Sequence, residues 1–300
     1  MIDLRRLTYF VAVAEELHFG RAAARLHIAQ PPLSQAIRKL EDELGVELFR
    51  RNRRRVELTD AGRLLLDNGR PLLQEADRVE ALLVKAGRGE AGRLRVGFVG
   101  SASYETLPAV LRAFRRDRPE VELTLREMTT PDQLAALGTG RIDVGLVRPP
   151  PRDVGPVDVL PLVEERLIAV LPDTHPLAAR ERVAVAELAE EPFVFFPRRI
   201  GVTLYDDVMD VCREAGFAPR VVQEADETHT VVSLVSAGIG VSLLPAAVET
   251  IRRPHVVFRP LSGPNTQLEL AVALRRGDRS PLVGRFVEAA RGYGSGIDAA

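Results

Sequence analysis

The sequence contains one cysteine and no tryptophan, and its five histidines are scattered. The single cysteine, Cys212, excludes an intramolecular disulfide and any cysteine-clustered metal site, and it suits a reducing compartment. We interpret Cys212 as a small buried hydrophobic residue. Because the histidines lack ligand spacing, no metal site is expected.

Long apolar runs are also missing. The weakly polar stretch from Val231 to Val248 is interrupted by serine, glycine and proline, so it is a poor candidate for crossing a bilayer. The first twenty residues carry acidic side chains within an apolar pattern and lack the order of a signal peptide. The sequence therefore predicts a cytoplasmic protein without a membrane partner.

The sequence has none of the common catalytic motifs. It contains no G-x-S-x-G, no H-E-x-x-H and no P-loop, and "GIGVSL" at Gly238 lacks the third glycine of a dinucleotide fingerprint. We accordingly expect no catalytic residues, no cofactor and no enzymatic activity.

What is present is a chain of 300 residues, with 46% hydrophobic and 28% charged residues, which are ordinary values for about two globular domains. Its net charge of −1 is unevenly distributed, because residues 1–58 hold eleven Lys or Arg against eight Asp or Glu. A basic amino-terminal part on an acidic body favours a nucleic-acid-binding module joined to a different domain.

Three helices are predicted in the first 45 residues. Apolar residues at helical spacing predict one over residues 3–17 and a second from about 19 to 26. A stripe that begins at Leu33 and ends at Leu44 predicts the third, and Gly45 ends it. Two helices joined by a short turn are typical of a helix-turn-helix.

Two prolines stand at the start of the third helix. Pro32 falls in its first turn, where the missing N–H has no partner in any case, whereas Gln30 and Pro31 belong to the turn or the very start. The helix face opposite the apolar stripe carries side chains that can read base edges. These residues are Pro31, Ser34, Gln35 and Arg38.

A basic hairpin is predicted directly after this helix. In "VELFRRNRRRVELTDAG" two short apolar strands flank a turn at Asn52 that is rich in arginine. Such a wing would set its arginines against phosphate or in a narrow minor groove.

The stretch "RAAARLHIAQPPLSQAIRKLEDELGVELFRRNRRRVELTDAG" resembles the winged helix-turn-helix of the LysR-type transcriptional regulators. The resemblance implies that Gln30, Pro31, Ser34 and Arg38 meet DNA, although Gln35 stands where many relatives have arginine. We expect a wider set of DNA contacts that also includes Pro32, Gln35, Arg51, Arg53 and Arg54.

A linker helix is predicted after the wing. Thr59 can act as its N-cap, and an apolar stripe from Leu65 to Ala86 repeats roughly as a heptad, which favours pairing with an identical helix. The resemblance also implies a dimerisation helix here. Gly69 and Pro71 fall inside the helix, so we expect them to kink or divide it.

The rest of the chain alternates strands and helices in two blocks, which predicts a mainly parallel sheet clothed by helices and two lobes. Ligands bind such sheets beyond the carboxyl ends of strands. The loops there are rich in hydroxyl groups, arginine and free N–H groups, which favours a small carboxylate. The expected ligand-binding residues are Ser101, Thr130, Arg148, Thr203, Leu204 and Thr228.

The resemblance extends over this half, where the family's effector domain is similar to periplasmic binding proteins, with two lobes crossed twice by the chain. "IAQPPLS", "LHFGRAA" and "GRIDVGLVRPP" are closest to members that sense acids from aromatic-compound breakdown. In those relatives the positions matching Ser101, Thr130, Thr203 and Leu204 hold the inducer; Arg148 is our own addition.

The expected fold is thus α/β, with a winged helix-turn-helix (1–58), a linker helix (59–88) and a two-lobed effector domain (91–300). Lobe I covers about 91–161 and 268–300, and lobe II about 162–267. The expected function is a ligand-responsive regulator that binds an interrupted palindrome in double-stranded promoter DNA, assembles as a dimer of dimers and contacts RNA polymerase. A cytosolic small-molecule binding protein, or an enzyme on the same two-lobed fold, is the alternative.

Overall fold

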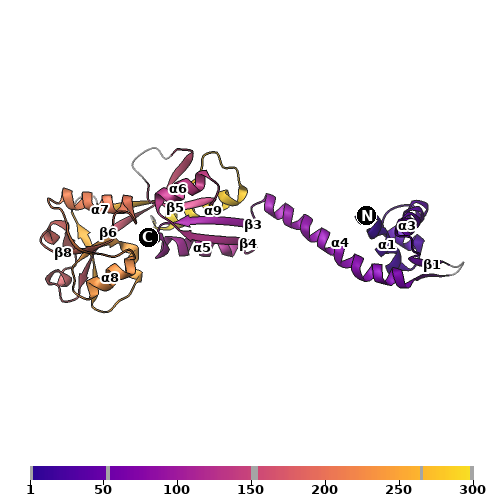
Figure 1. Ribbon diagram of the computed structural model, residues 1–300, viewed down its shortest axis with the longest axis horizontal. Helices are drawn as coiled ribbons and strands as arrows, with labels where there is room; N and C mark the ends of the chain where they lie inside the picture. The colour runs from indigo at the N-terminus through magenta and orange to yellow at the C-terminus, as the bar shows by residue number, and fades with distance from the viewer. Residues whose placement is uncertain (1–2, 52–54, 150–154, 264–265, 298–300) are drawn as a thin grey trace. The chain divides into compact units, whose positions relative to one another are not determined.

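The structure, a computed structural model, describes residues 3–51, 55–149, 155–263 and 266–297. Arg53 and Arg54, two of the expected DNA contacts, lie outside the described residues. The chain divides into two compact units, residues 1–85 and 86–300, and each is described by itself. Figure 1 shows the elements of both units.

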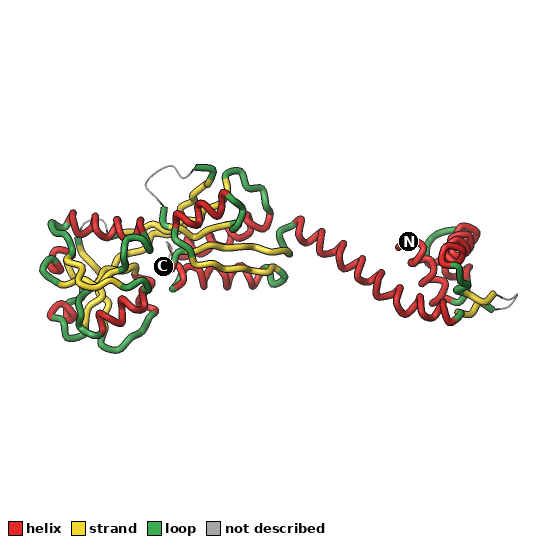
Figure 2. The backbone as a smooth tube through the Cα atoms, in the orientation of Figure 1, coloured by secondary structure: helices red, strands yellow, loops and turns green. Residues whose placement is uncertain are grey.

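The first unit is three helices, a two-stranded hairpin and most of a long helix (Figure 2). Its core joins buried side chains of all three short helices to the start of the hairpin, where Phe49 packs against the rings of Phe10 and Phe19. The elements are α1 (Leu4–Glu16), α2 (Phe19–Arg25), α3 (Gln30–Leu44), β1 (Phe49–Arg51), β2 (Val56–Leu58) and α4 (Asp60–Gly87).

Helix α3 begins at Gln30, so of the two positions left open for Gln30 and Pro31 the structure shows the start of the helix. Ala29 is its N-cap, so Gln30 and both prolines belong to the first turn. The backbone N–H groups of that turn have no acceptor within the helix, so the helix loses no hydrogen bond when proline lacks this group. The helix ends at Gly45, whose φ of 70° suits glycine, as expected. Of the apolar stripe, Leu33, Ile37 and Leu40 are fully buried, whereas Leu44 in the last turn is 38% exposed.

Helix α4 is one continuous helix that contains Pro71, so of the two expected outcomes, a kink or a division, the division does not occur. Pro71 is exposed, and water can replace the backbone hydrogen bond that it lacks. Gly69 has a packing role, because a Cβ there would lie 2.7 Å from Leu7 Cδ1. Thr59 caps the helix as predicted, since its Oγ1 accepts the N–H of Gly62 at 2.9 Å.

The second unit has two lobes built around a shared sheet. Lobe I holds β3 (Gly92–Phe98), the short helix η1 (Gly100–Ser103), α5 (Thr106–Asp117), β4 (Val121–Glu127), α6 (Thr130–Gly138), β5 (Val144–Val147) and α9 (Pro281–Ile297). Lobe II holds η2 (Pro176–Ala179), β7 (Val183–Ala184), η3 (Val185–Leu188), β8 (Pro192–Phe195), α7 (Val202–Glu214), β9 (Arg220–Glu224), α8 (Thr228–Ser236), β10 (Ser242–Pro245), η4 (Ala246–Thr250) and β11 (Val256–Ser262). Two strands cross between the lobes, β6 (Val157–Pro172) and β12 (Gln267–Arg275).

The sheet is mixed rather than mainly parallel, which corrects the sequence-based expectation. Its strand order is β4-β3-β5-β12-β6-β11-β7, with β10 also paired to β6. Strands β3, β4 and β5 are parallel, but the crossing strands β6 and β12 pair antiparallel with each other, and β12 is antiparallel to β5. A chain that leaves lobe I along β6 and returns along β12 must reverse direction, which the local pattern of each strand does not reveal.

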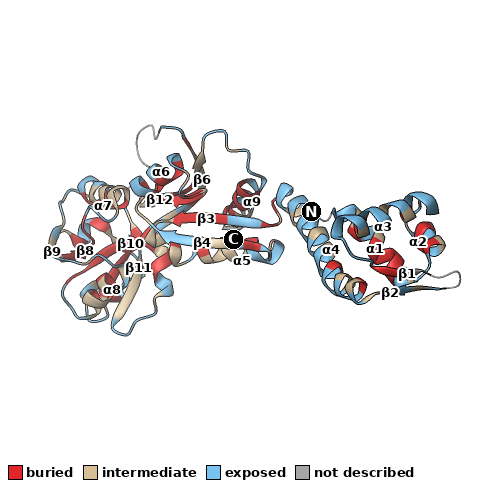
Figure 3. Cartoon of the chain, turned by 45° about the vertical axis from the view of Figure 1, so that its right-hand side comes forward, coloured by how far each residue is buried: buried red, intermediate tan, exposed pale blue. Residues whose placement is uncertain are grey.

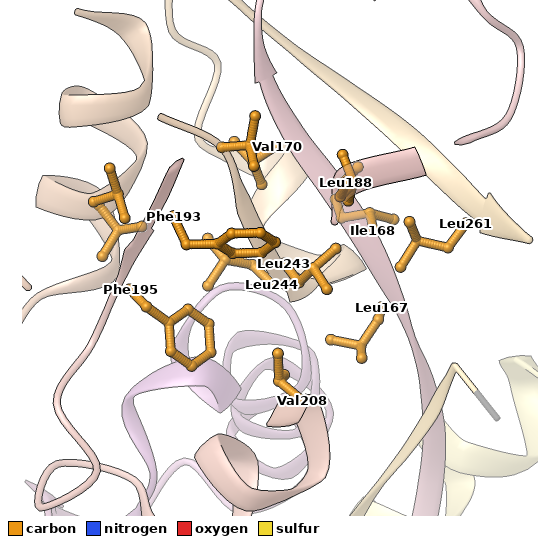
Figure 4. Close-up of a cluster of buried hydrophobic side chains, with 14 of the residues drawn as sticks. Leu167, Ile168, Val170, Leu188, Phe193, Phe195, Val208, Leu243, Leu244 and Leu261 are labelled. Carbon is orange, nitrogen blue, oxygen red and sulfur yellow. The ribbon is translucent and has the colours of Figure 1, made fainter. Parts of the chain in front are cut away.

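Each lobe has its own hydrophobic core. In lobe I, α5 and α9 cover the same face of the sheet, and their rings at Phe114 and Phe286 lie 5.5 Å apart. In lobe II, Phe193 and Phe195 lie among aliphatic side chains of β6 and β10 (Figure 4). Cys212 belongs to this core, and burial raises the pKa of its thiol to about 12, so it remains an unreactive thiol.

No helix among the described residues has both the length and the apolar character needed to cross a bilayer.

Candidate DNA interface and ligand cavity

The outer face of α3 is mostly exposed. Gln30, Gln35 and Arg38 are exposed, Ser34 is half-buried, and no hydrogen bond or ion pair of the Arg38 side chain is found there. Pro31 and Pro32 are exposed at the start of the same helix. The structure therefore presents all six α3 residues of the predicted DNA contacts on one element.

The wing is fixed to this helix through a residue that the sequence pattern did not single out for a role. The Glu41 side chain accepts the backbone N–H groups of Leu48 at 2.9 Å and Phe49 at 3.1 Å. Strands β1 and β2 then pair antiparallel, with Phe49 opposite Leu58 and Arg51 opposite Val56. Arg51 is thus the last residue of β1, and residues 52–54 of the predicted basic tip lie outside the described residues.

Most residues in the second half of α4 are exposed, and the others, Ala76, Leu82 and Lys85, are half-buried (Figure 3). Several large apolar side chains on it face water, including Leu72 at 56%, Val79 at 45% and Leu83 at 67% exposed. All three belong to the predicted heptad stripe. Exposed side chains of this size at heptad spacing are typical of a helix that pairs with another.

One cavity of about 560 Å³ lies in the second unit. Its size falls in the range of small-molecule sites. The expected ligand-binding residues all line it, although they come from five separate segments of the chain: Ser101, Thr130, Arg148, Thr203, Leu204 and Thr228. The strand-end rule pointed to the loops that hold these residues, and the family resemblance pointed to Ser101, Thr130, Thr203 and Leu204 within them.

Arg148 connects the cavity wall to both crossing strands. Its guanidinium donates to Ser101 Oγ at 3.2 Å, to the carbonyl oxygen of Glu269 on β12 at 3.3 Å, and to the carboxylate of Glu165 on β6. Its backbone N–H donates to Thr130 Oγ1 at 3.2 Å. Since Arg148 is only 2% exposed, Glu165 compensates a charge that burial would otherwise penalise. Sequence reasoning missed Glu165, because nothing in its neighbourhood marks it.

The start of α7 offers backbone N–H groups to the cavity. Gly201, Val202, Thr203 and Leu204 all line it, and no described side chain caps this helix. The first N–H groups of a helix have no acceptor within the helix and favour anions. By contrast, α6 is capped by Thr129, whose Oγ1 accepts the N–H of Asp132.

Tyr104 is a further cavity residue that sequence reasoning missed. It follows η1 in lobe I, and its ring packs partly against the core of lobe II. Burial raises the pKa of its hydroxyl, Glu127 and Glu227 add to the rise, and a hydrogen bond with Thr228 opposes it. Tyr104 therefore spans the two lobes beside the cavity.

Among the described residues, no group of three or more His, Cys, Asp or Glu side chains is arranged so that it could hold a metal ion.

Family models match nearly the whole chain. Residues 4–63 match the bacterial regulatory helix-turn-helix protein, lysR family, and residues 87–295 match the LysR substrate binding domain. The chain belongs to the LysR family of transcriptional regulators. As a member of this family, it is a DNA-binding transcriptional regulator and not an enzyme, which removes the alternative of an enzyme on the same fold.

Curated relatives agree with this assignment along the whole length. The LysR-type chain is 40% identical over 286 residues to the HTH-type transcriptional regulator AlsR of Bacillus subtilis (strain 168), covering 95% of this chain and 94% of AlsR. It is 43% identical over 287 residues to the uncharacterized HTH-type transcriptional regulator YnfL of Escherichia coli (strain K12), covering 95% and 96% of the two chains.

Solved structures of LysR regulators share the fold. Full-length CbnR in complex with its target DNA has a TM-score of 0.86 and 31% identity, covering 98% of this chain and all of CbnR. Full-length BenM has a TM-score of 0.64 and 31% identity, covering 99% of this chain and 98% of BenM. The winged helix-turn-helix joined to an α/β effector domain is thus confirmed.

Proposed function

We propose that this LysR-type regulator senses a small organic carboxylate and controls an operon near its own gene. Acids from aromatic-compound breakdown are one group of candidate ligands. The observation that carries the proposal is the convergence of Ser101, Thr130, Arg148, Thr203, Leu204 and Thr228 on one cavity. DNA binding and ligand binding then belong to separate compact units, which suits a protein that works on promoter DNA in the cytoplasm.

A carboxylate suits the hydroxyl groups and the helix start in the cavity wall. Ser101, Thr130 and Thr228 supply hydroxyl groups, and the uncapped start of α7 supplies N–H groups at Thr203 and Leu204. We assign Arg148 a supporting role, because its guanidinium already pairs with Glu165. A ligand carboxylate near Ser101 would compete for that guanidinium.

Residues 1–58 form the proposed DNA-binding domain. Helix α3 enters the major groove, with Gln30, Ser34, Gln35 and Arg38 toward the base edges and the prolines at the backbone. The wing arginines at 51, 53 and 54 add contacts to phosphate or the minor groove. The target is an interrupted palindrome, because paired domains read paired half-sites.

Residues 59–88 form the proposed dimerisation segment and 91–300 the proposed effector domain, with lobe II at about 162–267. Pairs formed through α4 combine through the effector domains into a dimer of dimers, which contacts RNA polymerase at the promoter. Ligand binding changes lobe closure and thereby the spacing of the DNA-binding pairs. Such a switch requires that the ligand bind one arrangement more tightly than the other.

Two substitutions test this division of labour. Arg38→Ala is expected to weaken operator binding by about 10- to 100-fold, the range for losing one good base contact, and to leave ligand binding unchanged. Thr130→Ala is expected to weaken ligand binding and leave operator binding in the absence of ligand unchanged. Exposed Arg180, in lobe II, gives the control Arg180→Ala, which should change neither. If Arg38→Ala and Thr130→Ala lose both properties together, the proposal is wrong.

A further inference from the structure

Four carboxylates line the cavity, which is unusual for a site that binds an anion. They are Glu127, Asp132, Asp226 and Glu227. Two of them are already engaged: Asp132 accepts the hydroxyl hydrogen of Thr129 at 2.7 Å, and Asp226 pairs with Arg199 at 2.7 Å. The other two need a separate explanation.

Glu127 and Glu227 reach the cavity from different lobes. Glu127 ends β4 in lobe I, and Glu227 is the N-cap residue of α8 in lobe II, although its side chain makes no capping hydrogen bond. Both line the same cavity as Tyr104, and the negative charge of each adds to the rise in the pKa of the Tyr104 hydroxyl. Within the described residues, neither has an ion-pair partner, and both are exposed. Two carboxylates without an ion-pair partner among the described residues therefore line one cavity from different lobes.

Glu127 lies close to the residues expected to bind the ligand carboxylate. A Cβ built on Gly100 would lie 2.6 Å from Glu127 Oε1, so this carboxylate lies directly against the residue before Ser101. The Glu127 carboxylate, which attracts cations, thus lies near Ser101, whose hydroxyl group is expected to bind an anion. This arrangement matches a ligand in which an ammonium group and a carboxylate are close together.

Independent observations indicate that the cavity takes an organic molecule. Arg148 is 98% buried in its wall, and the Nε hydrogen of Arg148 has no acceptor among the described residues. The described acidic side chains do not form a metal site. An apolar wall from Phe196, Ile200 and Leu204 faces the same space, which suits a hydrophobic side chain.

We propose that the ligand is an apolar α-amino acid or a close derivative, with its ammonium group between Glu127 and Glu227 and its carboxylate at the hydroxyl groups and the start of α7. This inference rests on the proposed function and narrows its ligand class. Each carboxylate accepts a charge-assisted hydrogen bond from the ammonium group, and His229 and Arg148 are the basic side chains in the same wall. Binding would draw Glu127 and Glu227 together and thereby favour closure of the lobes.

Isothermal titration calorimetry of the full chain tests the inference with matched probes. Leucine, methionine and phenylalanine are each compared with the corresponding 2-oxo acid, which replaces the ammonium-bearing carbon by a carbonyl. We expect at least one amino acid to bind about tenfold or more tightly than its 2-oxo acid, the size of one charge-assisted contact. Glu127→Gln and Glu227→Gln should each reduce this preference, and the double variant should remove it.

The control is Glu190→Gln, which changes an exposed carboxylate of lobe II outside the cavity and should keep the preference. Melting temperatures of the ligand-free variants check that each one folds. Tighter or equal binding of the 2-oxo acids would overturn the ammonium site while leaving the proposed carboxylate sensor intact. Absence of binding by all six probes would also overturn the inference, and footprinting on promoter DNA would then decide the regulator function separately.

Discussion

The Glu41 carboxylate on α3 accepts the backbone N–H of Leu48 at 2.9 Å, and this contact joins the recognition helix to the wing. Glu41→Ala would leave the N–H groups of Leu48 and Phe49 without this acceptor. We expect the free energy of unfolding to fall by about 1–3 kcal/mol. Hydrogen exchange of the peptide that contains both amides should become faster. Glu41→Gln is the matched control, because its amide oxygen can still accept, and it should exchange more slowly than Glu41→Ala. Equal exchange in Glu41→Ala and the wild type would contradict the role of this contact.

Gly62, in the first turn of α4, has no room for a side chain. A Cβ there would lie 2.2 Å from the carbonyl oxygen of Leu48, a backbone atom that cannot move without shifting the wing. Gly62→Ala should therefore destabilise the protein by about 1–3 kcal/mol, measured by urea unfolding. Gly87→Ala in the same helix meets no atom within 4 Å and should be neutral or slightly stabilising. Equal effects of the two substitutions would rule out the steric explanation.

Glu15 ties α1 to α2 and α4 through Arg25 and Arg70, each at 2.7 Å. Hydrogen bonds from Arg25 first, and then from Arg70, lower the pKa of Glu15 from 4.5. A lowered folded-state pKa stabilises the protein above the unfolded pKa, and this stability is lost as pH falls through the folded pKa. Glu15→Gln should therefore lower the free energy of unfolding by about 1 kcal/mol at pH 7, because solvent around the half-exposed arginines weakens both ion pairs. The loss should become smaller as the solution is acidified.

Urea unfolding at neutral and acidic pH measures this difference. The control is Glu75→Gln, whose carboxylate pairs with Arg78 three residues along the same helix and ties no second element. A penalty for Glu15→Gln that stays constant or grows on acidification would show that the stabilisation does not come from the ionised carboxylate.

The apolar stripe of α4 should carry self-association. Leu83 is 67% exposed in the single chain, and Leu83→Glu would place a charge in the paired surface. We expect the dimer dissociation constant to rise by at least about tenfold, since burying an unpaired charge costs more than ~1.4 kcal/mol. Ala81→Glu, on the other side of the same turn, is the control. Sedimentation velocity that finds the same assembly for wild type and Leu83→Glu would remove α4 from the interface.

Local patterns predicted the elements of the first unit because each one depends on residues close in sequence. The stripe at Leu33, the entry at Pro32 and the end at Gly45 all concern one helix, and the two paired strands of the wing are close together in sequence. The contacts that join these elements, such as Glu41 to Leu48, depend on the tertiary arrangement. They were accordingly not visible in the sequence.

The second unit shows where local reasoning fails. The return of the chain along β12 makes the sheet mixed, and the pairing of β12 with β6 joins residues about a hundred positions apart. The strand-end rule and the family resemblance together predicted the cavity wall, but Tyr104 lines it from the turn after η1, and Glu165 on a crossing strand acts only through its pair with Arg148. Glu127 stands at the end of β4, where the same rule could have found it.

A DNase footprint of the purified protein on the DNA upstream of its own gene, with and without a mixture of small carboxylates and amino acids, tests the central claim most directly. The account predicts protection of a long interrupted palindrome, with a pattern that changes when ligand is added. Low salt should strengthen the protection, because arginine contacts to phosphate are strongest there. Absence of protection at low salt, or a footprint unchanged by a ligand that calorimetry shows to bind, would contradict a ligand-switched regulator.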